Sequence, residues 1–324
     1  FGGSFTGGSD GDVVHPFGEG AYEKISAVGN TQGLNLTAGQ TGNTAYLDSL
    51  ELLRNQDEYD FNLLFLPGLI NDLHTDLIAR AINVCEDRGD CFVVVDASPY
   101  DSPPSTAITS AETRNTSFAG TYYPWVQVPD TLSGTSRWVP PSVAVSSVFA
   151  FNDKIGHPWN APAGLNRGGL DNIVQSERVL PQSDRDELYE SNVNPITRFA
   201  GQGHVVYGQK TLQKKSSALD RVNVRRLLIK VKKFIASSSR FLVFEQNNTA
   251  TRAKFLNIVN PYLEQVQSNS GLNAFRVIMD DTNNTPDVVD RNILYGQLFL
   301  QPTKTAEFVI LDFTVQPTGA SFSS

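Results

Sequence analysis

The first half of the chain alternates short apolar runs with longer segments of helical periodicity. Phe61–Leu66 is an apolar run interrupted only by Asn62 and followed by a Pro-Gly pair, and Cys91–Asp96 is a second run that ends in the aspartate. Both are typical of strands buried on both faces. Between them, Ile70–Arg88 carries apolar residues at helical spacing and is followed by Gly89, which favours a glycine-capped helix. This succession predicts a βαβ unit with parallel strands and a right-handed crossover.

The segments around this unit extend the same pattern. Helical spacing, or a proline at the start of an apolar stretch, indicates further helices. Pro195 follows a polar helix candidate, Ser183–Ser191, and marks the expected end of an α/β domain over 1–195. The additional expected elements are helices at Thr41–Asn55, Thr106–Asn115 and Pro140–Asn152 and a strand at Thr121–Val128.

The second half predicts a smaller α+β domain over 196–324. Helices are expected at Asp220–Ala236 and Thr249–Gln267, separated by a short apolar run, Phe241–Phe244, that we expect to be a buried strand. The fold class is therefore α/β to α+β: a mixed α/β domain with a βαβ unit, followed by a smaller α+β C-terminal domain. The other expected strands are His204–Tyr207, Phe275–Asp280, Ile293–Leu300 and Ala306–Thr314.

The helix expected at 220–236 has an apolar side and a basic side. The segment from Gly201 to Arg240 holds ten Lys or Arg and one acidic residue, a net +9 in a chain of −8, so the remainder carries −17. A basic helix on an acidic protein favours an acidic partner, with a merely solvated face as the alternative. The apolar stripe consists of Val224, Leu227, Leu228, Val231 and Ile235. The basic arc consists of Arg225, Arg226, Lys230, Lys232 and Lys233.

Composition narrows the class of protein. A length of 324 residues suits two domains, and 40% hydrophobic residues indicate a folded chain. Nucleic acid is a disfavoured partner, because no aromatic residues interleave with the cations and the remaining charge of −17 would repel it. No apolar run approaches the roughly 20 residues that cross a bilayer, so we expect no membrane partner.

Cys85 and Cys91 are interpreted as two buried thiols, with a disulfide as the alternative.

Motifs for chemistry are weak throughout the chain. Gly203–Thr211 (GHVVYGQKT) approaches a phosphate-binding loop, but Gln209 separates the second glycine from the lysine that would fold over the phosphates. An α/β enzyme or module that binds a phosphorylated ligand there remains the alternative function. Asp280–Thr285 lacks the glycine and glutamate spacing of a calcium loop and indicates capped turns. The four histidines are scattered, and we expect no catalytic residue, metal or cofactor.

A set of motifs in the second half resembles the contractile tail sheath proteins of myovirus-type bacteriophages. They follow the family's order from about Arg137 to Phe322, and the ordered set is far more specific than any single member. The region before residue 130 resembles the family only in its α/β pattern. The motifs are Asn160–Gly164 with Asn166–Gly168, Asn194-Pro195, Tyr207–Thr211, Asp220–Leu227, Phe244–Asn248, Thr282–Pro286 with Asp290–Asn292, and Gly319–Phe322.

This resemblance implies a structural subunit rather than an enzyme. Such subunits stack as six-membered rings in a helix around a tail tube, meet baseplate and tail terminator proteins, and contract to drive the tube through the bacterial envelope. The resemblance places the chain in the contractile tail of a virion assembled in the host cytoplasm. It also implies that the sequence is a fragment lacking the family's N-terminal region.

The resemblance assigns two sets of site residues. The five cations of the basic arc are expected to contact an acidic tube. An apolar strand with a polar tail can complete a neighbour's sheet, so the end of the chain is expected to exchange strands between subunits. The residues expected to carry this exchange are Phe308, Ile310, Phe313 and Phe322.

Overall fold

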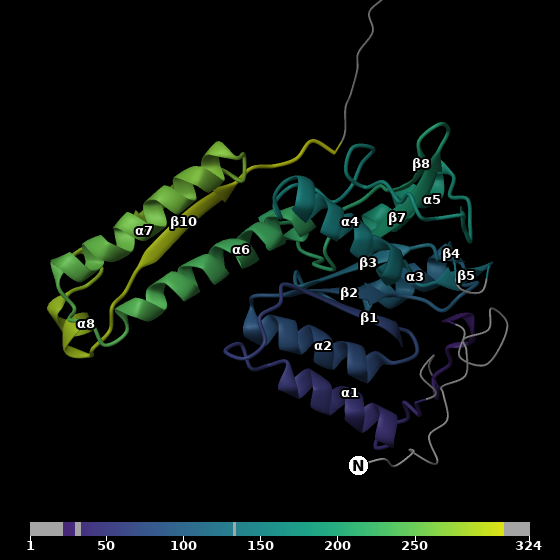
Figure 1. Ribbon diagram of the computed structural model, residues 1–324, viewed down its shortest axis with the longest axis horizontal. Helices are drawn as coiled ribbons and strands as arrows, with labels where there is room; N and C mark the ends of the chain where they lie inside the picture. The colour runs from purple at the N-terminus through teal and green to yellow at the C-terminus, as the bar shows by residue number, and fades with distance from the viewer. Residues whose placement is uncertain (1–21, 30–33, 132–133, 308–324) are drawn as a thin grey trace, which may run out of the picture.

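A five-stranded sheet organises the larger part of the chain in the computed structural model, which describes residues 22–29, 34–131 and 134–307 (Figure 1). The strand order is β1-β2-β3-β7-β8, with the first four strands parallel and β8 antiparallel to β7. The bounds are β1 Leu63–Ile70, β2 Phe92–Asp96, β3 Ala119–Tyr123, β7 Val193–Phe199 and β8 Gly203–Val206.

Helices pack on both faces of this sheet and make a three-layer body. Val93 and Val95 of β2 point to the face covered by α1, α2, α3 and α5, whereas Phe92 and Val94 point to the face covered by α4 and the start of α6. All four side chains are at most 2% exposed. Alternate strand residues point to opposite faces, so a strand buried on both must be continuously apolar. The helices are α1 Thr41–Leu52, α2 Thr75–Arg88, α3 Pro104–Glu112, α4 Pro141–Ile155, α5 Gln182–Glu190 and α6 Val222–Ser239.

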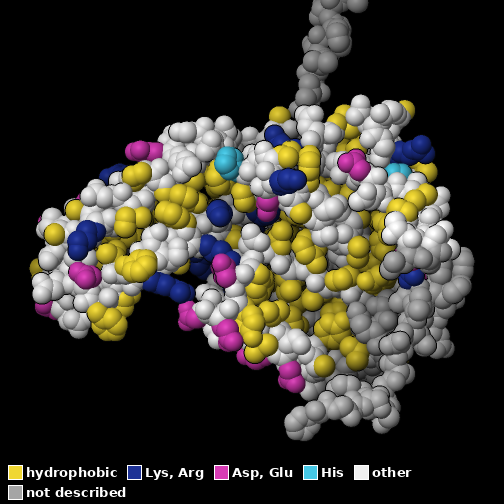
Figure 2. All heavy atoms as spheres, in the orientation of Figure 1, with side chains coloured by type: hydrophobic (Ala, Val, Ile, Leu, Met, Phe, Trp, Pro, Cys, Tyr) yellow, Lys and Arg dark blue, Asp and Glu magenta, His cyan; other side chains and the backbone are white. Residues whose placement is uncertain are grey.

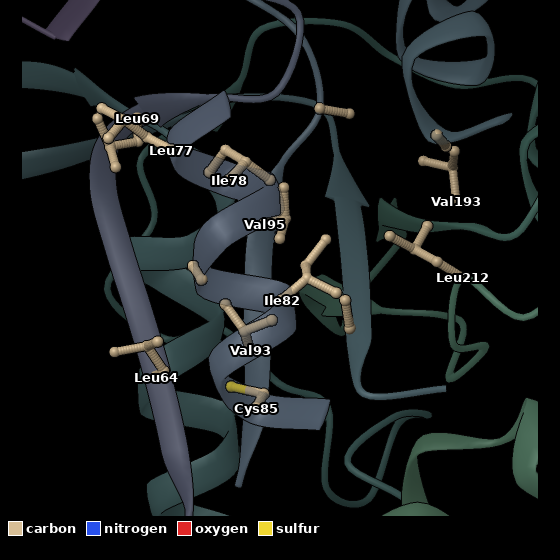
Figure 3. Close-up of a cluster of buried hydrophobic side chains, with 14 of the residues drawn as sticks. Leu64, Leu69, Leu77, Ile78, Ile82, Cys85, Val93, Val95, Val193 and Leu212 are labelled. Atoms are coloured by element: carbon tan, nitrogen blue, oxygen red, sulfur yellow. The ribbon is translucent and has the colours of Figure 1, made fainter. Parts of the chain in front are cut away.

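The βαβ prediction is confirmed. β1, α2 and β2 follow one another, and β1 and β2 are parallel. Figure 3 shows Ile78, Ile82 and Cys85 of α2 beside Val93 and Val95 of β2. Gly89 ends α2 with a left-handed φ of 64°, as expected of a glycine cap. Both cysteines are buried free thiols.

Two details of the body differ from expectation. The Pro-Gly pair does not end the first strand, because β1 continues to Ile70 across a register shift between Phe65 and Ile70. A second, three-stranded sheet of order β5-β4-β6 was not predicted, and the single strand expected at Thr121–Val128 is instead the end of β3 and the start of β4. Its strands are too short for a periodic signal to stand out. They are β4 Val126–Asp130, β5 Thr135–Val139 and β6 Gln175–Ser176.

An elongated C-terminal unit projects from the body, and α6 connects the two (Figure 1). The long helix α7, Thr249–Ser268, packs on an antiparallel pair of strands, β9 (Leu272–Ile278) and β10 (Gln297–Pro302). A separate core joins α7 and β9 to Leu227 and Val231 of α6. The short helix α8, Pro286–Asp290, lies in the connection between the strands. Among the described residues, no helix has the length and apolar character needed to cross a membrane.

The expected boundary at Pro195 falls inside β7, in the sheet of the body. Thr197, Arg198 and Phe199 still pair with β8, which makes both strands part of the body's sheet. The mixed α/β body followed by a smaller C-terminal unit nevertheless confirms the expected fold class.

The strand expected at Phe241–Phe244 is wrong. The chain there forms a 3-10 turn, η3 (Arg240–Leu242), between α6 and α7. Phe241 is 84% exposed and Phe244 fully exposed, because the apolar stripes of the two flanking helices already fill the core of the unit. Of the strand expected at Ala306–Thr314, only Ala306 and Glu307 lie within the described residues, and neither belongs to a strand.

Candidate interaction site on the basic helix

Helix α6 lies between two hydrophobic cores. Leu227 and Val231, from the predicted apolar stripe, pack into the core of the C-terminal unit. Val222 and Ile229, on another side of the helix, pack into the core of the body. The arc that carries the cations is therefore turned partly toward the body rather than wholly toward solvent.

The two arginines of the basic arc are buried inside the subunit. Arg226 is 3% exposed, and its Nη2 lies 2.5 Å from Oδ2 of Asp153. The guanidinium of Arg225 stacks over the ring of Phe118 at 3.9 Å and donates to the hydroxyl of Ser117. Burial lowers the pKa of Arg225 to about 10, an effect that the more distant Glu86 partly offsets. These two residues hold α6 on the body and are not available to a partner.

Two lysines of the arc also bind the body, at its exposed edge. Lys233 Nζ lies 2.5 Å from Oδ1 of Asp60 and 2.6 Å from the carbonyl oxygen of Phe61. The hydrogen bond from Lys233 lowers the pKa of Asp60. Lys232 Nζ donates at 3.0 Å to the carbonyl oxygen of Arg88, in the last turn of α2, where the helix dipole favours a cation.

Lys230 differs from the other four cations. It is exposed, and it has no hydrogen bond or ion pair within the described part of the chain. It borders a cavity of about 240 Å³ between α6 and the loop before β1, together with Asp60, Arg226 and Lys233. Figure 2 shows Lys and Arg side chains gathered in the recess between the C-terminal unit and the body, opposite acidic side chains on the body's edge.

The acidic partners of this recess were missed in the sequence. Asp57 binds Arg240 at 2.6 Å, and Asp60 binds Lys233. Both lie in a polar segment that the sequence indicates only as the end of the first helix. Arg88, whose carbonyl oxygen accepts from Lys232, is 2% exposed. Its guanidinium donates to the carboxylate of Asp90 through Nε at 2.8 Å and through Nη2 at 3.1 Å. The opposite charges of this acidic segment and the basic helix could have suggested that the two pair, but they do not identify which residues form the contacts.

A second polar site lies where the chain returns to the body after β10. Both carboxylate oxygens of Glu307 accept hydrogen bonds. Oε1 accepts from Arg221 Nε at 2.7 Å and from Gln209 Nε2 at 3.2 Å. Oε2 accepts from Arg221 Nη2 at 2.9 Å and from the hydroxyl of Tyr189 at 2.7 Å. This contact joins the last described residue to three separate segments of the chain.

The loop that resembles a phosphate-binding motif forms part of this second site. Gln209 contacts Glu307, and Lys210 Nζ lies 4.5 Å from the ring centre of Tyr189. The amide groups that would cradle a phosphate are occupied, because Lys210 N donates to Asn194 at 2.6 Å and Thr211 N to Asp220 at 3.0 Å. The structure therefore gives this motif a structural use and does not support a phosphorylated ligand there.

The four residues expected to exchange strands, Phe308, Ile310, Phe313 and Phe322, lie outside the described residues. The possible acceptor is described. β9 and β10 form a sheet of two strands, and each pairs only with the other within the described residues. Each therefore leaves one row of backbone groups available to a further strand.

Two family models match consecutive parts of the chain. Residues 39–212 match the phage tail sheath protein central domain, and residues 214–316 match the phage tail sheath C-terminal domain. The tail sheath protein of Vibrio phage KVP40 is 38% identical over 194 residues, covering 60% of this chain and 29% of that protein. The tail sheath protein of Enterobacteria phage T4 is 37% identical over 193 residues, with the same two coverages. The chain thus spans about three tenths of the length of these relatives.

Solved structures share the fold. The sheath of an extracellular contractile injection system, in the contracted state, has a TM-score of 0.70 at 25% identity, covering 82% of this chain and 74% of that chain. The helical sheath of the anti-feeding prophage, also contracted, has a TM-score of 0.69 at 23% identity, covering 85% and 75%. The two family models divide between residues 212 and 214, just after the body's sheet ends.

Proposed function

Because the chain belongs to the phage tail sheath family, we propose that it is part of a structural subunit of a contractile phage tail sheath. In this proposal the subunit polymerises helically around the tail tube and contracts to drive the tube through the host envelope during genome delivery. The observation that carries it is the ordered match of both sheath domains across residues 39–316.

The proposal requires no catalytic site. The proteins that this chain resembles are named as sheath proteins, that is, as structural components. Contraction can draw on free energy stored during assembly, when an extended lattice is kinetically trapped above a contracted one of larger buried interface. The occupied amides of the 203–211 loop are consistent with a subunit that uses no nucleotide.

The partners follow from the same proposal. They are other copies of the sheath subunit, the tail tube, and the baseplate and tail terminator proteins at the two ends, in a virion assembled in the host cytoplasm. Support for other sheath copies and for the baseplate as partners comes from similar folds in a helical sheath and in a baseplate assembly.

We propose Lys230 as the principal tube contact, with Lys232 beside it. Lys230 is exposed and its charge acts on Asp60 across the cavity that both line, whereas Lys232 is exposed although its ammonium group binds the end of α2. Arg225, Arg226 and Lys233 support this contact indirectly, since they fix α6 to the body. Long-range attraction to an acidic tube would orient the subunit before close contact forms.

We propose that the β9–β10 sheet receives strands from neighbouring subunits, and that the segment after Glu307 supplies one. Addition of a strand would satisfy the free backbone groups at a sheet edge. This arrangement links subunits by main-chain hydrogen bonds, which persist while the bodies move relative to one another.

Electron microscopy of the full-length protein, expressed alone and with its tube protein, tests the proposal. Long hollow tubes of regular helical symmetry are expected. A protein that stays monomeric under both conditions, at concentrations where related sheaths polymerise, would contradict the proposed function.

A further inference from the structure

After β10, the chain crosses back from the C-terminal unit to the body (Figure 1). Little apolar packing holds this crossing, because Lys304, Thr305 and Ala306 are all exposed. Thr305 accepts a hydrogen bond from Gln209 at 2.7 Å, and Glu307 accepts the four already described. The attachment of the crossing to the body therefore depends mainly on one carboxylate.

The residues that bind Glu307 are also held in place by contacts with other parts of the chain. Asn194, which is fully buried, accepts from the amide of Lys210 and donates to its carbonyl oxygen at 2.8 Å. Val222 N donates to the carbonyl oxygen of Gln209 at 2.8 Å, which ties the loop to the start of α6. A Cβ at Gly208 would lie 2.9 Å from Asn194 Oδ1 and 3.0 Å from the ring of Tyr189, so the glycine allows both side chains to approach the loop closely. We call Tyr189, Gln209 and Arg221 the Glu307 socket.

The electrostatics of the socket favour an ionised Glu307. Burial alone would raise the pKa of Glu307, but the hydrogen bonds from Arg221 and Tyr189 outweigh it and lower the pKa. Burial also tends to lower the pKa of Arg221, and the bond to Glu307 raises it above its ordinary value. A bidentate arginine fixes both the position and the orientation of a carboxylate, which a single lysine could not do.

We propose that Glu307 is the positioning residue for inter-subunit strand exchange: its bonds to the Glu307 socket fix the point on the body from which residues 308–324 begin. This inference rests on the proposed function. The length of chain available to reach a neighbour then counts from residue 307 and not from the end of β10 at Pro302. Arg221 immediately precedes α6, so tension on the segment is delivered to the first turn of that helix and to the body, rather than to the two-stranded sheet.

Limited trypsin digestion of the full-length protein tests the anchor, because Lys304 lies inside the crossing that the socket restrains. We expect Glu307→Ala to accelerate cleavage after Lys304 by about tenfold or more, the effect of losing one or more charge-assisted hydrogen bonds on local opening. Glu307→Gln should give a smaller acceleration, since the amide keeps an acceptor for Tyr189. Glu264→Gln, on an exposed face of α7, is the matched control and should cleave like the wild type.

Electron microscopy of the same variants tests positioning. Glu307→Ala should fold with an unchanged circular dichroism spectrum and form few or short sheaths, whereas Glu264→Gln should form normal ones. Wild-type cleavage after Lys304 in Glu307→Ala would overturn the anchor, and normal sheaths from a variant with accelerated cleavage would overturn its positioning role. Failure of the wild type to polymerise would instead overturn the proposed function, and the cleavage result would still stand.

Discussion

Asp96 is a carboxylate buried at the end of β2. It is 2% exposed, and it accepts hydrogen bonds from Ser142 N at 2.9 Å and from the Ser142 hydroxyl at 2.6 Å. Burial raises its pKa to about 7, although both bonds from Ser142 act to lower it. The folded state therefore holds this proton at a pH where the unfolded chain has released it.

Linkage makes this residue a source of pH-dependent stability. The unfolded carboxyl titrates near pH 4, so between about pH 4 and pH 7 the folded state binds more protons and the free energy of unfolding falls as pH rises. We expect the free energy of unfolding of Asp96→Asn to fall by roughly 2 to 4 kcal/mol less than that of the wild type as pH rises through this range. Urea unfolding at pH 5 and pH 8 measures this change, with Asp186→Asn at an exposed position of α5 as the control. Burial also raises the pKa of Glu177 to about 7, so the variant should flatten the dependence without abolishing it. An unchanged dependence would exclude Asp96 as its source.

Phe244 offers a test of backbone strain. Its φ is 70°, a left-handed conformation that costs a non-glycine residue about 1 kcal/mol or more, and its side chain is fully exposed. We expect Phe244→Gly to raise the free energy of unfolding by about 1 kcal/mol, because it relieves this strain. The greater conformational entropy of glycine in the unfolded chain should offset part of that gain. Asn292→Gly, at a φ of 59°, is the comparison and should change less, because asparagine tolerates this region. A destabilised Phe244→Gly would show that the side chain packs in solution.

At the scale of elements, α6 carries buried cations that stabilise the fold and exposed cations that are proposed to contact the tube. We expect Arg226→Ala to lower the free energy of unfolding by about 2 to 4 kcal/mol, because it leaves Asp153 without its buried partner. Lys230→Ala should change it by no more than about 0.5 kcal/mol. Chemical denaturation of both variants measures the difference. Equal losses in the free energy of unfolding would mean that Arg226 and Lys230 contribute equally to the stability of the fold.

The same helix carries a prediction for assembly. Reversal of Lys230 and Lys232 to Glu in the full-length protein should abolish sheaths around tubes while the subunit stays folded and soluble, with a lower melting temperature because Lys232 loses its bond to the Arg88 carbonyl oxygen. The expected cause is repulsion from an acidic tube surface. Reversal of the exposed Lys154 and Lys254 is the matched control. Co-expression with the tube protein followed by electron microscopy gives the readout, and normally sheathed tubes from the double reversal would refute the contact.

Periodicity predicted the elements of this fold better than it predicted their partners. The βαβ unit was predictable because a strand covered on both faces is apolar along most of its length, as are the four residues of β2 before Asp96. The apolar stripe of α6 was predictable for the same kind of reason. What covers its other side was not, because spacing identifies a face but not the surface against it. Arg225 and Arg226 are buried by residues more than 70 positions away, such as Ser117 and Asp153, and no local pattern encodes that pairing.

At the scale of the whole molecule, the roles of the body, the C-terminal unit and the segment after Glu307 depend on which of them joins neighbouring subunits. If the body and the C-terminal unit act as one piece held by α6, the links between subunits must lie in segments that can leave their own subunit. The chain beyond the Glu307 socket is the candidate, and Phe322 is the aromatic residue nearest its end. An aromatic side chain added to the face of a partner's sheet contributes apolar burial beyond the backbone hydrogen bonds of the added strand.

Truncation tests this arrangement. Deletion of residues 316–324 from the full-length protein should leave a soluble subunit of unchanged melting temperature that no longer polymerises, because it removes the end of the segment proposed to join neighbouring subunits. Phe322→Ser should weaken polymerisation while keeping the length of the segment. Replacement of Ser321, Ser323 and Ser324 by alanine keeps both the length and the aromatic ring and should polymerise normally. Sedimentation and electron microscopy measure the outcome. Normal polymers from the deletion variant would mean that another part of the chain links the subunits and pairs with the open edges of β9 and β10.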